Sequence, residues 1–160
     1  METTSLLLLQ ELLIYELEKM SKSTEVNALS ANLRTIGGNI GHKAMLKISS
    51  SAAASKTKGV QACMKFFVEF FWEFVFGKKI EKYQIIEPNR LIFTDPDCEL
   101  ITRISACGPN SHAFQEHCKN LVRNLIEGGL EALNIKNTVE IAITDARTVQ
   151  FSVECSEMTY

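Results

Sequence analysis

The stretch that decides the fold is VQACMKFFVEFFWEFVF, residues 60–76. Its polar positions recur every four residues and form one thin stripe along a helix. They are Gln61, Lys65, Glu69 and Glu73. Aromatic residues take nearly every other direction, and a helix that is apolar almost all round is typical of a central core element. We therefore predict a core helix that ends at Gly77, because glycine readily adopts the left-handed conformation that closes a helix.

Two further helices are predicted on the N-terminal side. Residues 2–20 place leucines at helical spacing, and other aliphatic residues widen this apolar face. After Thr24, which can cap a second helix, apolar residues recur at alternating intervals of three and four. They are Val26, Leu29, Leu33, Ile36 and Ile40. Such a narrow seam is of the kind that two packed helices share.

A line of small residues runs along the same second helix, at Gly37, Gly41 and Ala44. Each glycine inside a helix costs about 1 kcal/mol relative to alanine, so its presence needs a physical reason. Close approach of another helix backbone would provide one. The alternative is that the helix breaks at Gly37-Gly38.

The rest of the chain alternates between strand and helix patterns. Residues 83–86 and 90–93 indicate short strands joined at Glu87-Pro88-Asn89. Residues 111–133 indicate a helix followed by a left-handed Asn134, and residues 138–155 indicate an antiparallel hairpin with one buried face. We predict one α+β domain over residues 1–160. Its four helices and antiparallel sheet of about four strands follow the order ααα-ββ-α-ββ.

Composition excludes some classes of function. The formal net charge of −2 gives no reason to expect nucleic-acid binding, which needs a basic surface. No secretory signal and no stretch long enough to span a membrane is apparent. The five cysteines are odd in number and form no CxxC pair, so we expect free thiols in a reducing, cytoplasmic compartment.

No residue pattern points firmly to catalysis, a cofactor or a metal. The Gly-Gly pairs lack the spacing of a nucleotide-binding loop. A metal site would draw on His112, His117, Cys118, Cys98 and Cys107. The two histidines are five residues apart, however, and the cysteines lack the paired spacing of zinc sites. We therefore predict no catalytic residue, no cofactor and no metal. A nucleophilic Cys107–His112 pair stays as an alternative.

Two surface hypotheses are left open by the residues alone. Trp72 and the phenylalanines could line a lipid or small-molecule pocket, although at helical spacing they are more typical of a filled core. Lys78, Lys79 and Lys82 could touch a membrane, or could simply be solvated charges that complement a helix C-terminus.

Three segments together resemble the small α+β subunits of TRAPP, the transport protein particle that tethers vesicles. They are GGNIGHKAML at 37–46, the aromatic helix with its basic end at 63–82, and GGLEALNIK at 128–136 with the hairpin that ends in VQFSV at 149–153. The likeness covers residues 6–154. It is greatest to the group called subunit six in animals, the thirty-three-kilodalton subunit in yeast, with subunit five second.

Two departures from the family pattern matter. Asn124 and Glu127 replace a glycine and an arginine that are usual in the fourth helix. The palmitate-carrying relative has a cysteine in the loop before its third helix. Here residues 49–59 contain none, and Cys63 lies inside the helix, so the resemblance implies no acyl attachment.

The resemblance implies a non-catalytic subunit of a tether that acts between endoplasmic reticulum and Golgi, peripheral to the membrane. The whole complex would act as an exchange factor for a Rab-type GTPase. The first two helices would pair with those of a Bet-three-like subunit, and the isolated chain could pair with itself. The expected interface residues are Leu6, Leu9, Leu13, Leu29, Leu33, Ile36 and Ile40. The rival hypothesis is a regulatory domain of the same fold that binds a small hydrophobic or acyl ligand.

Overall fold

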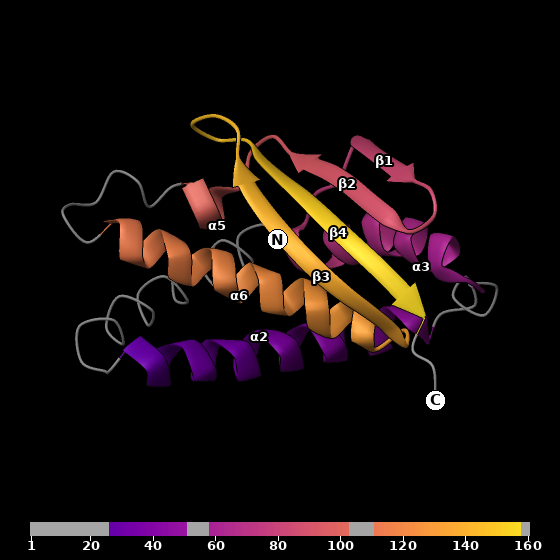
Figure 1. Cartoon of the computed structure of the whole chain (residues 1–160), viewed down its shortest axis with the longest axis horizontal. Coiled ribbons are helices and arrows are strands. Elements are labelled where there is room, and N and C mark those ends of the chain that lie inside the picture. The colour runs from indigo at the N-terminus through magenta and orange to yellow at the C-terminus, as the bar shows by residue number, and fades with distance from the viewer. Residues whose placement is uncertain (1–25, 51–57, 103–110, 158–160) are drawn as a thin grey trace.

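The computed structural model describes residues 26–50, 58–102 and 111–157. Its elements are α2 (Val26–Ser49), α3 (Val60–Phe66), η2 (Phe67–Phe71), α4 (Trp72–Phe76), β1 (Lys82–Ile86), β2 (Arg90–Asp95), α5 (Glu99–Thr102), α6 (Ser111–Glu131), β3 (Ile135–Ile143) and β4 (Val149–Glu157). The predicted first helix, residues 2–20, lies outside the described residues. In Figure 1, α6 lies between α2 and the sheet. The predicted α+β fold is confirmed.

The four strands form one antiparallel sheet in the order β1-β2-β4-β3. The predicted alternation is clearest in β4, where the apolar side chains at every second position are buried. They pair across the sheet, with Phe151 opposite Phe93 on one side and Ile141 on the other. At the end of β3, Ile143 is exposed by 37%.

The aromatic helix is one continuous run of α3, η2 and α4 over residues 60–76, with a π-helical turn in its middle. Its rings fill the space above the sheet. The Trp72 ring lies 4.9 Å from Phe93 and 4.9 Å from Phe151, and Phe93 and Phe151 stack at 4.8 Å. Gly77 ends the helix with φ 71°, as predicted.

One part of the prediction for this helix is wrong. The stripe of Gln61, Lys65, Glu69 and Glu73 is exposed as expected. Phe70 and Phe74 are also exposed, by 45% and 46%. They directly follow Glu69 and Glu73, so they lie beside the stripe, on a flank that neither the sheet nor α6 covers.

The glycine line of α2 packs against α6, as the close-approach hypothesis requires. A Cβ atom at Gly37 would lie 2.9 Å from the Leu121 carbonyl oxygen, and one at Gly41 would overlap the Leu125 carbonyl. Gly128 of α6 approaches the backbone of Gly38 equally closely. The two helices run in the same direction. Gly37 lies beside Leu121, and Gly41, one turn later in α2, lies beside Leu125 and Gly129, which are one and two turns later in α6. The helix does not break at Gly37-Gly38.

No helix in the described ranges combines the length and the apolar character needed to cross a membrane.

Candidate protein-interaction surface

The exposed flank of α2 carries part of the predicted interface. Ile36 and Ile40 are 44% and 40% exposed, one turn apart on the helix. Large apolar side chains that stay this accessible at neighbouring positions are typical of an interaction surface. Leu6, Leu9 and Leu13 lie outside the described residues, and the side chain of Leu29 is not described either.

Leu33 belongs to the interior of this chain instead. Its exposed fraction is 2%. Leu33, one turn before Gly37 and two before Gly41, lies on the side of α2 that faces α6. Ile36 and Ile40 lie on the neighbouring, exposed side. The predicted seam is therefore divided between an internal and an external face. A polar substitution at Leu33 would therefore destabilise the fold, and a loss of binding in that variant would not identify an interface.

A second exposed apolar feature lies where the end of α2 meets η2 and α4. An open groove of about 310 Å³ is lined by Ile48, Phe66, Phe70, Glu73 and Phe74, and we call it the phenylalanine groove. The Phe66 and Phe70 rings lie 5.0 Å apart along one wall. The ammonium group of Lys47 lies 5.9 Å from the centre of the Phe74 ring, so the C-terminal turns of α2 reach the groove.

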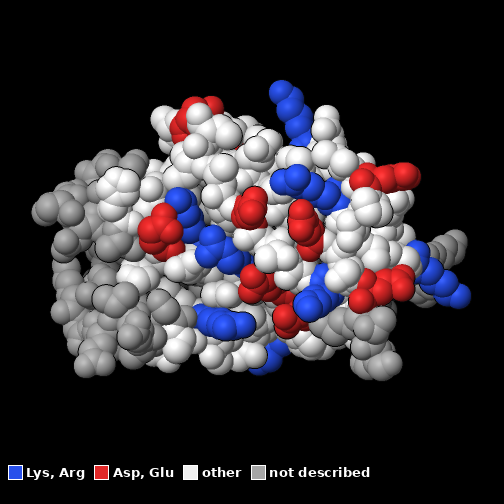
Figure 2. Space-filling view, in the orientation of Figure 1, with Lys and Arg blue, Asp and Glu red and all other residues white. Residues whose placement is uncertain are grey.

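The charges on the face seen in Figure 2 alternate in sign. Lysines and arginines are interspersed with aspartates and glutamates, and no large region of one sign forms on this face. Nucleic-acid binding needs a continuous basic surface. This face does not offer one.

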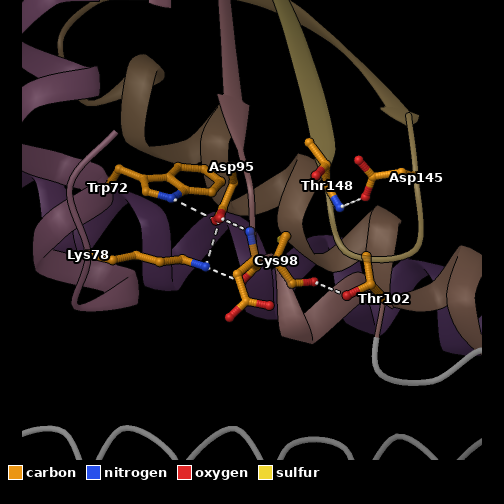
Figure 3. Close-up of polar contacts among 8 residues, drawn as sticks. Trp72, Lys78, Asp95, Cys98, Thr102, Asp145 and Thr148 are labelled. Atoms are coloured by element: carbon orange, nitrogen blue, oxygen red, sulfur yellow. Dashed lines mark hydrogen bonds and ion pairs between the residues drawn. The ribbon is translucent and has the colours of Figure 1, made fainter. Parts of the chain in front are cut away.

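The predicted lysine cluster is not a single unit, because Lys78 is only partly exposed and pairs with a buried carboxylate. Figure 3 shows its ammonium group directed at the carboxylate of Asp95, which is fully buried, and the two groups lie 2.8 Å apart. The same carboxylate accepts hydrogen bonds from Trp72 Nε1 at 3.2 Å and from the backbone N–H of Asp97 at 3.0 Å. Lys78 also donates to the Asp97 carbonyl. Its role is thus to neutralise a buried carboxylate, and neither hypothesis made for the cluster describes it.

Lys79 and Lys82 remain surface residues. Lys79 lies 3.9 Å from Glu73 with its side chain largely in solvent, and Lys82 is exposed at the start of β1. The sequence carries little signal for the Asp95 cluster, because Trp72 and Asp95 are 23 positions apart and meet only in the folded chain.

The cysteines of the described ranges are buried free thiols. Burial raises the pKa of Cys98, Cys118 and Cys155 from 9.0 to about 12 in each case. A thiol with so high a pKa is a poor nucleophile, since the thiolate is the reactive form. Cys107 lies outside the described residues, so the Cys107–His112 pair stays an untested alternative.

Cys107 of the metal hypothesis lies outside the described residues, and the other four residues do not form a group that could hold a metal ion. His112 is exposed, whereas His117 and Cys118 are buried in α6. Within the described ranges, no group of three or more His, Cys, Asp or Glu residues is placed to hold a metal ion.

We expect Cys98, Cys118 and Cys155 to resist alkylation by iodoacetamide at pH 7.5 in the folded chain and to react fully in urea, measured by peptide mass spectrometry. Their folded pKa lies above the unfolded value of 9.0. The stability contributed by the protonated thiols is therefore complete below pH 9 and is lost as the pH rises from 9 toward 12. Rapid labelling at pH 7.5 without unfolding would contradict this burial.

Comparisons with known proteins give a consistent result. The model of the family described as "Transport protein particle (TRAPP) component" matches residues 6–156. Among solved structures, the fold is similar to a trafficking protein particle complex subunit 3 from Naegleria fowleri that is covalently bound to palmitic acid. The TM-score is 0.68 with 14% identity, over 94% of this chain and 96% of that chain. No sequence among the curated proteins matches this chain.

Proposed function

Because this chain belongs to the TRAPP component family, we propose that it is a non-catalytic subunit of a TRAPP complex and that it pairs with a Bet-three-like subunit through α2. Family membership indicates a subunit of a trafficking complex. The finer proposals are a place in transport between endoplasmic reticulum and Golgi, and a part in the complex that acts on a Rab-type GTPase. We propose the subunit-six group for this chain, with the subunit-five group as the alternative.

The observation that carries the pairing is the exposed side of α2. The adjacent side of this helix is held against α6 by backbone contacts at Gly37 and Gly41. Ile36 and Ile40 are left accessible on a rigid helix, with no neighbouring element of the described chain to cover them. Burial of apolar surface contributes roughly 25 cal/mol per Å², so covering both side chains would favour association.

The test is co-purification from cells with the tagged full-length chain. We expect wild type to recover other TRAPP subunits, identified by mass spectrometry, and Ile36→Glu/Ile40→Glu to recover at least tenfold less of its paired subunit. A charged residue in the centre of an apolar contact leaves an unpaired charge in a dehydrated site.

The matched control is Ile86→Glu in β1, because Ile86 is 43% exposed and β1 is the edge strand opposite β3, the strand that packs on α6. This control should recover TRAPP subunits as wild type does. Equal recovery by all three chains would exclude α2 as the pairing surface. Absence of TRAPP subunits from the wild-type sample would overturn the proposed function itself.

The rival hypothesis of acyl binding keeps one point in its favour, the palmitic acid held by the Naegleria subunit. In the described part of the chain, however, large aromatic side chains occupy the space between the helices and the sheet. Phe67, Phe71 and Trp72 are all fully buried there, and the Phe67 and Phe71 rings stack at 4.7 Å. Native mass spectrometry of the purified full chain separates the two hypotheses, since a stoichiometric fatty acid would favour the ligand-binding domain.

A further inference from the structure

We propose that the phenylalanine groove is a second docking surface, which receives large apolar side chains from an acidic amphipathic helix of a neighbouring TRAPP subunit. The inference rests on the proposed function, because it takes the partner from the same complex. It adds a surface that involves η2 and α4, and it specifies the chemistry of the partner.

The groove offers aromatic area that the described chain leaves uncovered. Phe70 and Phe74 stand one turn apart and are each nearly half exposed, while Ile48 and the largely buried Phe66 complete the lining. Exposed aromatic side chains grouped in this way mark interaction sites, and aromatics dominate the energetics of protein interfaces. A volume of about 310 Å³ is at the small end of ligand clefts and suits one or two large side chains.

The charges around the groove select an acidic partner. Glu69 and Glu73 are next to the two phenylalanines in the sequence, and each already has a lysine partner. Lys65 lies 3.9 Å from Glu69, and Lys79 lies 3.9 Å from Glu73. Lys43 and Lys47 on the α2 side form no ion pair with any described residue. Lys47 lies over the Phe74 ring, at the rim of the groove. A partner with carboxylates beside its apolar residues would therefore complement this rim.

The groove continues the exposed side of α2. Ile36, Ile40, Lys43 and Lys47 are all exposed, and their spacings of four, three and four place them in one stripe. The stripe leads from the two isoleucines to Phe74. An amphipathic helix laid along the lysine end of this stripe, beyond the two isoleucines, would anchor apolar side chains in the groove and set its acidic residues against Lys43 and Lys47.

The first experiment identifies the occupant. The photoreactive amino acid p-benzoylphenylalanine replaces Phe74 in the tagged full-length chain, the complex is purified from cells and irradiated, and the crosslinked peptide is sequenced by mass spectrometry. We expect a helix of another TRAPP subunit with aspartate or glutamate beside its apolar residues. A crosslink only to a second copy of this chain, only to lipid, or to nothing would overturn the proposal.

The second experiment uses substitutions and needs no photochemistry. We expect Phe70→Ser/Phe74→Ser and Lys43→Glu/Lys47→Glu each to lower recovery of the crosslinked subunit at least tenfold. Lysines introduced at the partner's acidic positions should restore recovery by Lys43→Glu/Lys47→Glu. The matched controls, Ile143→Ser and Lys136→Glu on exposed positions of β3, should bind as wild type. Thermal unfolding followed by circular dichroism confirms that every variant is folded.

The two proposals fail in different ways. If the groove variants retain all TRAPP subunits while Ile36→Glu/Ile40→Glu loses its paired subunit, the groove inference is wrong and the proposed function stands. If wild type recovers no TRAPP subunit, both are wrong.

Discussion

Gly41→Ala will destabilise this protein by about 1–3 kcal/mol, the usual range for overpacking a filled core, whereas Gly38→Ala on the same helix will not destabilise it. A Cβ atom at Gly41 would overlap the carbonyl group of Leu125 and lie 3.0 Å from the backbone nitrogen of Gly129. These obstacles are backbone atoms of α6, which cannot rotate away as a side chain can. The two helices would have to separate, and the packing around Met45 would loosen with them.

Gly38 provides the matched control. A Cβ atom there would meet no atom within 4 Å, and alanine is favoured over glycine inside a helix by about 1 kcal/mol. Gly38→Ala should therefore leave the free energy of unfolding unchanged or raise it. Urea unfolding of both variants, followed by circular dichroism, measures the difference. Equal stability of the two alanine variants would show that α2 and α6 are not in backbone contact at Gly41.

Lys78→Met will destabilise the protein by about 3 kcal/mol, the lower end of the range for removing one member of a buried ion pair. Asp95 is fully buried, and its remaining partners, the indole N–H of Trp72 and one backbone N–H, do not neutralise its charge. The effect stays near the lower end because the Lys78 side chain is 35% exposed, so water screens part of the interaction.

Lys79→Met is the control for Lys78→Met. Its ion pair with Glu73 is long and its side chain is 74% exposed, so the change should stay within about 1 kcal/mol. The double variant Lys78→Met/Asp95→Asn should be more stable than Lys78→Met alone, because the uncompensated carboxylate is gone. Urea midpoints and slopes for all three variants give these values. Equal stability of Lys78→Met and Lys79→Met would contradict the buried pair.

Much of the fold follows from local patterns. The spacing of Gln61, Lys65, Glu69 and Glu73 correctly predicts both a helix and its solvent-facing stripe. The alternation in residues 149–155 correctly predicts a strand with one buried face. Periodicity identifies side chains that share a face, because that depends only on the geometry of a single element.

The candidate surface was harder to predict for a physical reason. The seam of Leu33, Ile36 and Ile40 has a single period, yet Leu33 is buried and the other two are exposed. Periodicity does not say which neighbour covers a face or how far round the helix its contact extends. The same reason explains Phe70 and Phe74, which share the composition of their buried neighbours and differ from them only in lying beyond the edge of the sheet and α6.

The sequence by itself determined most of the described elements, their order and the small residues that allow α2 and α6 to touch, but neither the short helix α5 nor the π-helical turn η2. Helical and strand periods, together with Gly77 and Asn134 at left-handed positions, act within a few residues of chain, so they can be read from the letters. The tertiary structure alone decided which apolar residues stay accessible and that Asp95 joins Trp72 and Lys78. Those outcomes depend on contacts between segments that are distant in the sequence. The aromatic helix at 60–76 illustrates this, because one side of it is buried in the core and the flank with Phe70 and Phe74 stays exposed, where we propose that a partner docks.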